Sequence, residues 1–252
     1  MENEREPYNS PLKNIFGIRA VAEAINAGRE IDKVLIKRDL DGELFHELFA
    51  LIRGAGVPFQ FVPIEKLNRI TRKNHQGVIA LMSAVEYQPL QSLIPMIYEK
   101  GEDPFLLILD GVTDVRNVGA IARSAECAGV HSLIVPEKGG APMNADAMKT
   151  SAGALNHIPV CRSANLKSDI LFLRNSGIQI VGITEKASDI YFSSLLNGPV
   201  ALVLGAEDTG ISNDILRLCD KLVSIPMKGR ISSLNVSAAA SVILFDIIRQ
   251  RS

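Results

Sequence analysis

The chain is poor in the residues that build disulfide frameworks and metal sites. Its 252 residues include three cysteines, four histidines and no tryptophan. The cysteines (Cys127, Cys161 and Cys219) are isolated, and the histidines show no metal-ligand spacing, so neither a disulfide framework nor a metal site is expected. No apolar run reaches the length of a membrane span, and the polar, charged segment Met1–Ser10 resembles neither a signal peptide nor an anchor. We therefore expect a soluble, reduced, cytoplasmic protein.

The chain also lacks a strong excess of charge of either sign. It has 27 lysines and arginines against 28 aspartates and glutamates, a net charge of −1, which does not by itself indicate a nucleic-acid-binding protein. Residues 7–85 carry a small positive excess, and their densest basic cluster contains Arg69, Arg72, Lys73 and His75. Such a cluster is as often a solvated face as a binding surface, so charge leaves RNA binding undecided.

Apolar residues are abundant, at 47% of the chain, which is enough core for one large domain or two modest ones. The first part reads as a compact α/β unit. Its helices are expected over 14–27, 43–53 and 64–70, and its strands over 34–36, 59–62 and 78–82. A proline- and glycine-containing stretch with one short helix then follows. We place an N-terminal domain at residues 10–85, a linker at 86–103 and a C-terminal domain at 104–252.

From Phe105 onward, near-continuous apolar strands alternate with helical segments. The strands are expected over 105–109, 132–135, 178–183, 200–204 and 222–225. Strands of this composition are buried on both faces, which predicts a parallel sheet covered by helices. Ligands of open α/β sheets bind beyond the carboxyl ends of the strands. Three polar blocks follow strands in this domain, so they can contribute to one site.

The block Gly205–Ser212 has the glycine spacing of a phosphate-binding loop but not its chemistry. Ile211 stands where such a loop needs its lysine, and no G-x-G-x-x-G follows the first strand of the domain, so neither an NTPase nor a standard dinucleotide site is indicated. What remains is a glycine-bounded turn that carries Glu207 and Asp208 ahead of a helix that Ser212 can cap. Glu207 could also simply favour the start of that helix electrostatically.

The block Asp110–Ala125 places Asn117 and Arg123 six residues apart, with Gly119 and other small residues between them. If Asn117 lies at or just before a helix start, Arg123 projects nearly two turns along that helix. The small residues would let another backbone or a substrate approach closely. Taken alone, the pair could equally be a capping asparagine and a surface cation.

The block Ile225–Ser237 is the most informative. A strand ends, a loop containing Gly229 follows, and a helix is expected to open on Ser232, Ser233 and Asn235, which are residue types that cap helix starts. Free backbone N–H groups at a helix start, beside a glycine that permits close approach, would form a pocket for a polar ligand. Three neighbouring apolar residues are expected in the core: Leu234, Val236 and Ile243.

Taken in their order along the chain, the three blocks resemble the three motifs of the SpoU (TrmH-type) RNA 2′-O-ribose methyltransferases, and three ordered matches are far more specific than one. Over nearly its whole length the chain looks most like the RlmB-like subgroup, which acts on a guanosine of 23S ribosomal RNA. The resemblance implies an α/β, parallel-sheet trefoil-knot (SPOUT) domain, S-adenosyl-L-methionine as cofactor and a homodimer. The N-terminal unit resembles, more weakly, the ribosomal-protein-like RNA-binding domain of that subgroup, for example at His75–Val78.

Carried over by position, the resemblance assigns roles to the motif residues. The catalytic set would be Arg123, supported by Asn117, Glu207, Ser233 and Asn235. The cofactor would contact Gly205, Ile225 and Leu234, largely through backbone groups, with Met227 and Gly229 as neighbours in the same loop. Thr184, which follows another strand, could line the cleft or simply end its strand. The basic cluster of Arg69, Arg72, Lys73 and His75 would contact RNA, and no metal or membrane is implied.

The implied reaction is in-line attack of a ribose 2′-hydroxyl on a sulfonium methyl, which requires alignment and stabilisation of charge on the attacking oxygen. A guanidinium stays protonated in proteins. We therefore expect Arg123 to hold the adjacent phosphate and stabilise the developing alkoxide rather than to act as a base. Two other functions remain open, methylation of a tRNA ribose and a non-catalytic RNA-binding or ribosome-assembly role on the same fold. The intact Arg123 and Asn235 argue against the second.

Overall fold

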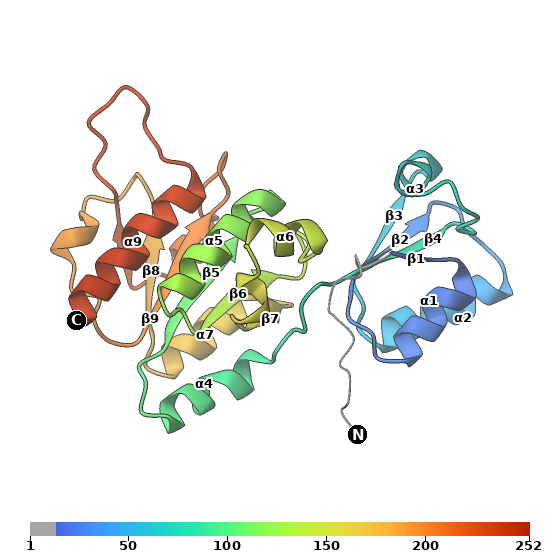
Figure 1. Cartoon of the computed structure of the whole chain (residues 1–252), viewed down its shortest axis with the longest axis horizontal. Helices are drawn as coiled ribbons and strands as arrows, with labels where there is room; N and C mark the ends of the chain where they lie inside the picture. Colours follow the sequence, from blue (N-terminus) through green and yellow to red (C-terminus); the bar gives the residue numbers. More distant parts are fainter. Residues whose placement is uncertain (1–13) are drawn as a thin grey trace, which may run out of the picture. The chain divides into compact units, whose positions relative to one another are not determined.

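The computed structural model describes residues 14–252 (Figure 1). The segment Met1–Ser10 and the first residues of the expected N-terminal domain lie outside that range. The chain divides into two compact units, one that ends at Ala84 and also includes Met143–Ala145, and one that contains Val85–Pro142 and Asp146–Ser252. No helix within residues 14–252 combines the length and the apolar character needed to cross a bilayer.

The first unit is a four-stranded sheet with helices on both faces. In sheet order, its strands are β1 (Ile15–Phe16), β4 (Val78–Met82), β2 (Ile31–Lys37) and β3 (Phe59–Val62). β4 is antiparallel to both of its neighbours, whereas β3 is parallel to β2. The helices α1 (Ile18–Asn26) and α2 (Glu43–Gly54) bury their apolar residues on one face, and α3 (Ile64–Ile70) packs Leu67 on the other.

The sequence predicted β3, α3 and β4 at the observed residues, but the first helix begins later than expected. Ile15 and Phe16 pair with β4 instead of starting a helix. Gly17 then precedes α1 with a φ of 96°, a backbone conformation that glycine adopts without steric cost. The periodic apolar pattern spans both segments, so it hid the break between them.

The second unit is built on a six-stranded sheet. In sheet order, its strands are β10 (Lys221–Val223), β8 (Gln179–Ile183), β9 (Val200–Gly205), β5 (Phe105–Asp110), β6 (Ser132–Pro136) and β7 (Val160–Ser163). Every neighbouring pair is parallel, which confirms the predicted parallel sheet. β7 was not predicted, because its four residues are half polar, and β10 ends two residues before the expected end.

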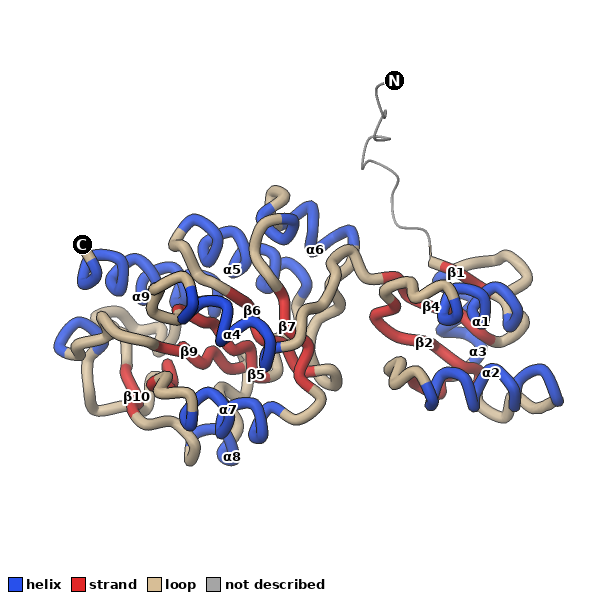
Figure 2. Tube along the Cα trace, turned by 90° about the horizontal axis from the view of Figure 1, so that it is seen from below, coloured by secondary structure: helices blue, strands red, loops and turns tan. Residues whose placement is uncertain are grey.

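Helices cover both faces of this sheet (Figure 2). On one face lie α4 (Leu90–Glu99), α7 (Leu166–Asn175) and α8 (Asn213–Leu216). On the other lie α5 (Val115–Cys127) and α9 (Val236–Arg251), with α6 (Ala145–Thr150) packed against α5. Two 3-10 helices, η1 (Ala154–Asn156) and η2 (Tyr191–Ser193), complete the unit.

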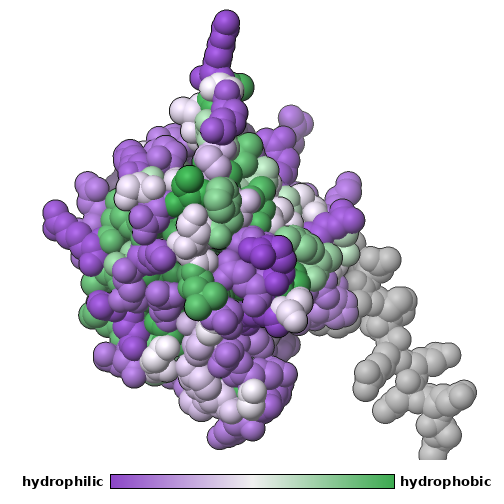
Figure 3. Space-filling model, turned by 90° about the vertical axis from the view of Figure 1, so that its left-hand side faces the viewer, coloured by the Kyte–Doolittle hydropathy of each residue, from purple (hydrophilic) through white to green (hydrophobic). Residues whose placement is uncertain are grey.

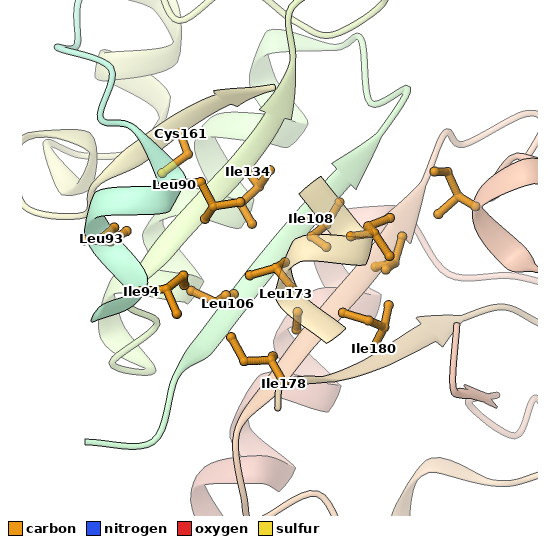
Figure 4. Close-up of a cluster of buried hydrophobic side chains, with 14 of the residues drawn as sticks. Leu90, Leu93, Ile94, Leu106, Ile108, Ile134, Cys161, Leu173, Ile178 and Ile180 are labelled. Carbon is orange, nitrogen blue, oxygen red and sulfur yellow. The ribbon is translucent and has the colours of Figure 1, made fainter. Parts of the chain in front are cut away.

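The stretch expected to be a linker contributes directly to this core. Leu90, Leu93 and Ile94 of α4 point toward the sheet beside Leu106 of β5 and Leu173 of α7 (Figure 4). These side chains are all at most 8% exposed. Burial of that much apolar surface makes α4 an integral part of the second unit.

The last part of the chain crosses the sheet. β10 lies at the sheet edge, yet the helix that follows it, α9, packs on α5, which follows the more central strand β5. The connection from 224 to 235 forms the long loop above α9 in Figure 1. It therefore brings the third polar block back to the middle of the sheet, where the first two blocks lie.

Candidate active site

One polar side chain from each of the three blocks meets the other two beyond the carboxyl ends of β5 and β9. The Asn235 side-chain nitrogen donates hydrogen bonds to Oδ1 of Asn117 (3.1 Å) and to Oε1 of Glu207 (2.5 Å). Asn117 lies in α5 after β5, Glu207 lies in the turn after β9, and Asn235 directly precedes α9. The predicted convergence of the three blocks is therefore present for these residues.

Asn117 does not cap α5, so the alternative of a capping asparagine, left open by the sequence, is wrong. The cap is Asp114, whose carboxylate accepts from the backbone N–H of Arg116 at 2.8 Å and from the Arg116 guanidinium at 3.2 Å. This side-chain hydrogen bond is the main reason that the pKa of Asp114 is lowered and that of Arg116 is raised; Glu207 raises the latter further. With the cap satisfied by Asp114, Asn117 lies inside the first turn, 8% exposed, and its amide is free to bond Asn235.

Asn235 is the cap of α9, and it alone of the three predicted polar residues has this role. Its Oδ1 accepts from the backbone N–H (2.9 Å) and the hydroxyl (2.6 Å) of Ser237. The helix begins at Val236, so Ser232 and Ser233 lie in the exposed loop before it and do not open the helix as expected.

Of the three apolar residues expected in the core near this cap, two are buried and one is exposed. Val236 and Ile243 are buried, as predicted, whereas Leu234 is 41% exposed. Leu234 belongs to the loop and not to the helix, so the helical spacing that suggested its burial does not apply to it.

Arg123 is placed differently from the three clustered residues. It is exposed on α5, and within the described part of the chain it makes no hydrogen bond or ion pair. Residues seven apart share a helix face, and Asn117 and Ser124 both contact the start of α9. Arg123 therefore lies on a neighbouring face, and a single chain does not bring it to Glu207 or Asn235. Ser233 likewise contacts none of them.

The expected cofactor residues lie around the loop that precedes α9. Ile225 and Met227 are half-buried, whereas Gly229 and Leu234 are exposed. Across residues 225–234 no backbone N–H donates to another backbone group of the described chain. A stretch with free main-chain donors beside apolar side chains suits a ligand held mostly by backbone groups.

The glycines of this region have distinct roles. A Cβ on Gly205 would lie 2.1 Å from the Gly210 carbonyl carbon, so the turn between these glycines closes only without a side chain there. Gly229 has open space around it, so the close approach expected there does not come from this chain. Thr184 directly follows β8, and its backbone N–H donates to the Val223 carbonyl oxygen at 3.0 Å, which places it beside the start of the 224–235 connection.

In the first unit, the basic cluster divides into exposed and buried members. Arg69, Arg72 and Lys73 are exposed, and the Lys73 ammonium lies 5.5 Å from the centre of the Phe16 ring. His75 is only 8% exposed. Its Nδ1 accepts from the Gly77 N–H at 3.0 Å, so its Nε2 carries the proton and donates to Asn68 at 3.0 Å. The imidazole thus holds the loop that follows α3.

Three residues that the sequence reasoning missed extend the Asn235 contacts: Ser124, Ser237 and Ser241. Ser241 Oγ lies 2.9 Å from the Ser237 carbonyl oxygen and 2.8 Å from Ser124 Oγ. The sequence does show the relevant spacings. Ser237 and Ser241 are four residues apart, and Asn117 and Ser124 are seven apart, so each pair lies on one helix face. Without knowledge that α5 and α9 are neighbours, however, neither spacing indicates a contact.

The described residues contain no group of side chains that could bind a metal ion. No group of three or more His, Cys, Asp or Glu among residues 14–252 could hold an ion. Cys219 is further disfavoured as a ligand, because burial, with smaller contributions from Asp220 and Asp110, raises its pKa to about 11. A thiol that stays protonated at neutral pH is a poor metal ligand.

Comparison with known proteins gives matches over nearly the whole chain. The SpoU rRNA Methylase family profile matches residues 104–245, and the profile for RNA 2′-O ribose methyltransferase substrate binding matches residues 14–88. The 23S rRNA (guanosine-2′-O-)-methyltransferase RlmB of Photorhabdus laumondii is 40% identical over 242 residues, and that of Escherichia coli K12 is 38% identical over 241. Each alignment covers 94% of this chain and 98% of the relative.

A solved structure agrees with these matches. The SpoU methyltransferase AviRb from Streptomyces viridochromogenes, determined in complex with AdoMet, superposes with a TM-score of 0.60 at 28% identity. The superposition covers 99% of this chain and 94% of that one.

Proposed function

The chain belongs to the SpoU rRNA methylase family, and from that premise we propose that it methylates the ribose 2′-hydroxyl of a guanosine in 23S ribosomal RNA with S-adenosyl-L-methionine as methyl donor. The observation that carries the proposal is the meeting of Asn117, Glu207 and Asn235, one residue from each motif. Such a cluster at the carboxyl ends of parallel strands is where an α/β sheet binds its ligands.

The cofactor site is assigned to the loop from 225 to 234 and to Gly205. The free backbone donors of the loop and its half-buried Ile225 and Met227 offer the mixed polar and apolar lining that an adenosine-containing ligand needs. The nearby Glu207 carboxylate gives the site a negative charge that complements a cationic ligand. When bound, S-adenosyl-L-methionine supplies an electrophilic methyl group. Thr184, at the end of β8, borders the same loop.

We assign Arg123 to bind the RNA backbone next to the target ribose. Its guanidinium is exposed and forms no ion pair within residues 14–252. It is therefore available to bind a phosphate. A protonated guanidinium that holds the phosphate next to the target ribose also stabilises negative charge on the 2′-oxygen. Asn117 and Asn235 support the site through their mutual hydrogen bond, and Ser233, in the loop before α9, is assigned the same supporting role.

We also propose that the connection from 224 to 235 is the threaded segment of a trefoil knot. The chain leaves β10 at the sheet edge and returns to α5. On the way it passes the turn after β9, because Asn235 bonds Glu207. Threaded chains are rare among proteins, and the return from the sheet edge to α5 is the observation that supports one here.

The domain assignment follows the same proposal. We assign residues 10–85 to the RNA substrate-binding domain, 86–103 to the connecting stretch, whose helix α4 packs on the core of the second unit, and 104–252 to the methyltransferase domain. The exposed Arg69, Arg72 and Lys73 of the first domain are assigned to RNA phosphates, and His75 supports them by holding their loop. A ribosomal RNA substrate is consistent with a cytoplasmic location.

A homodimer is proposed from the apolar surface of the second unit. Phe192, Leu195 and Phe245 are 53%, 74% and 51% exposed. The Gln250 side chain bonds both Leu196 and Ser194, so the segment that carries Phe192 and Leu195 lies against the end of α9. Figure 3 views this side and shows apolar areas among hydrophilic ones. Exposed apolar clusters of this kind mark interaction sites.

The proposal is tested by methyl transfer to 23S ribosomal RNA isolated from cells that lack this protein. The wild-type chain should methylate a single ribose, and Arg123→Ala should lower kcat by about 10²–10³-fold, the loss typical for removal of a group that stabilises transition-state charge. Calorimetry with S-adenosylhomocysteine should give an unchanged Kd, because Arg123 is assigned to RNA.

Arg217→Ala is the matched control. Arg217 is another exposed arginine of this unit, and it lies directly after the short helix α8, outside the three motifs. It should leave kcat and Kd unchanged. Equal loss of kcat and cofactor affinity in Arg123→Ala would refute the assigned role. Methylation of tRNA instead of ribosomal RNA, or of neither, would refute the substrate or the activity.

A further inference from the structure

A chain of hydrogen bonds leads from the Asn235 cap into the contact between α5 and α9. Ser237 Oγ lies 2.6 Å from Asn235 Oδ1, and Ser241 Oγ lies 2.9 Å from the Ser237 carbonyl oxygen. Ser124 Oγ, on α5, lies 2.8 Å from Ser241 Oγ. With Asn117 and Glu207, six residues from three segments are thus linked, and the step from Ser237 to Ser241 passes through the Ser237 backbone carbonyl.

The direction of every bond in this chain follows from the chemistry of the groups. A carboxylate only accepts and a backbone N–H only donates, so Asn235 must turn its nitrogen to Glu207 and its oxygen to Ser237. The Ser237 hydroxyl therefore donates to that oxygen. The single proton of Ser241 goes to the Ser237 carbonyl oxygen, which leaves Ser124 as the donor to Ser241.

Asn235 has no hydrogen-bonding capacity left in this arrangement. Its nitrogen carries two protons, which go to Asn117 and Glu207, and its oxygen accepts two bonds from Ser237. A rotation of the amide by 180° would turn its oxygen toward the Glu207 carboxylate and the Asn117 carbonyl oxygen, and three acceptors would face each other. Without Ser237 Oγ, the Asn235 oxygen keeps only its bond from the backbone N–H, and the amide is held by three hydrogen bonds in place of four.

We propose that Ser237 is a positioning residue whose hydroxyl restrains the Asn235 amide in this orientation and thereby holds Glu207 and Asn117 in place, while Ser241 and Ser124 join the same helix start to α5. The hydrogen bond between Ser241 of α9 and Ser124 of α5 also fixes α9 against the residue next to Arg123. The Asn235 cap and the part of α5 that carries Arg123 are therefore held in a fixed relative position. The role of Ser237 is exerted through Asn235, and its kinetic consequence depends on the methyltransferase function proposed above.

A double-mutant cycle tests whether Ser237 acts through Asn235. Ser237→Ala keeps the backbone bond to the cap and should lower kcat by about two- to tenfold, the range for loss of one neutral hydrogen bond. KM for RNA should stay the same, because no member of the serine network is assigned to RNA. In an Asn235→Ala background, Ser237→Ala should have no further effect, because the group it positions is absent. Additive losses would overturn the proposal.

Two further variants separate the hydroxyl from general packing. Ser237→Thr keeps a hydroxyl and should restore kcat to within about twofold of wild type. Ser168→Ala should leave kcat unchanged: Ser168 lies in the first turn of α7 behind the cap Asn165, and its hydroxyl bonds no described residue. A loss in Ser237→Thr as large as that in Ser237→Ala would overturn the proposal.

A spectroscopic readout makes the result independent of catalysis. In wild type, the two side-chain amide protons of Asn235 should exchange slowly and give a resolved NMR pair, because both are hydrogen-bonded. Ser237→Ala should shift this pair and speed its exchange, whereas Ser168→Ala should not. If wild type fails to methylate RNA but this signature appears, the proposed function fails and the network stands. If the pair is unchanged in Ser237→Ala, the network assignment is wrong.

Discussion

The basic side chains near α3 differ in how free they are to meet a phosphate. Arg69 and Arg72 are exposed and bond no other residue of the described chain, whereas Lys73 lies over the Phe16 ring and His75 has both ring nitrogens engaged. The sequence showed these four residues only as one cluster. Their separation into two free arginines, one partly held lysine and one structural histidine comes from the fold of the loop after α3.

The two arginines should therefore account for the electrostatic contribution of this cluster to RNA binding. Replacement of both Arg69 and Arg72 by alanine should weaken RNA binding. It should also lower the slope of log Kd against log salt by about 0.7 for each phosphate of single-stranded RNA that the protein no longer neutralises. Fluorescence anisotropy over a salt series measures both. Arg53→Ala on α2, which covers the other sheet face, should change neither. If Arg53→Ala weakened RNA binding and lowered the salt slope equally, the effect of the Arg69 and Arg72 substitutions would reflect net charge and not a binding surface.

At the scale of elements, the sequence predicted what depends on local periodicity. The central strands of the second unit are continuous apolar runs, and such runs are diagnostic of a buried parallel sheet. Helix starts were less accurate, because several capping residue types compete in each block: Asp114 caps α5, where Asn117 was one candidate, and Asn235 alone caps α9, where Ser232, Ser233 and Asn235 were all expected at the start. Only tertiary contacts decide between such candidates.

The packing of α5 on α6 depends on one glycine in the helix interior. A Cβ on Gly119 would lie 2.6 Å from the Thr150 Cβ and 3.0 Å from two backbone atoms of the α6 segment. Gly119→Ala should therefore destabilise the protein by about 1–3 kcal/mol despite the better helix propensity of alanine. Gly54→Ala at the end of α2, where nothing lies within 4 Å, should instead raise stability by up to about 1 kcal/mol. Chemical denaturation measures both, and equal effects would contradict the assigned contact.

At the scale of the whole molecule, the position of Arg123 is the feature that a sequence could not supply. The motifs predict one site that contains both Arg123 and Asn235, yet a single chain puts Arg123 on a neighbouring face of α5 and not among the bonded residues Glu207 and Asn235. Local spacing cannot distinguish a site completed within one chain from one completed by a second copy. The crossing of the 224–235 connection is equally invisible to periodicity, since it depends on which strand each helix follows in space.

If two copies associate through the surface of Phe192, Leu195 and Phe245, one charged substitution there should separate them. Leu195 is the most exposed of the three, at 74%. Leu195→Glu should shift the mass measured by light scattering from about twice 27.3 kDa to 27.3 kDa, because burial of an unpaired carboxylate in an apolar interface costs several kcal/mol. The folded state should survive, since an exposed side chain adds little to the core.

Leu171→Glu is the matched control, because Leu171 is also an exposed leucine, at 45%, but lies on α7, which covers the opposite face of the sheet from α9. It should leave the mass unchanged. If Arg123 completes the site of the second copy, the monomeric Leu195→Glu variant should also lose methyl transfer while its circular dichroism and melting temperature stay close to those of Leu171→Glu. A monomeric wild-type protein, or a monomeric variant with full activity, would show that one chain is sufficient for the site.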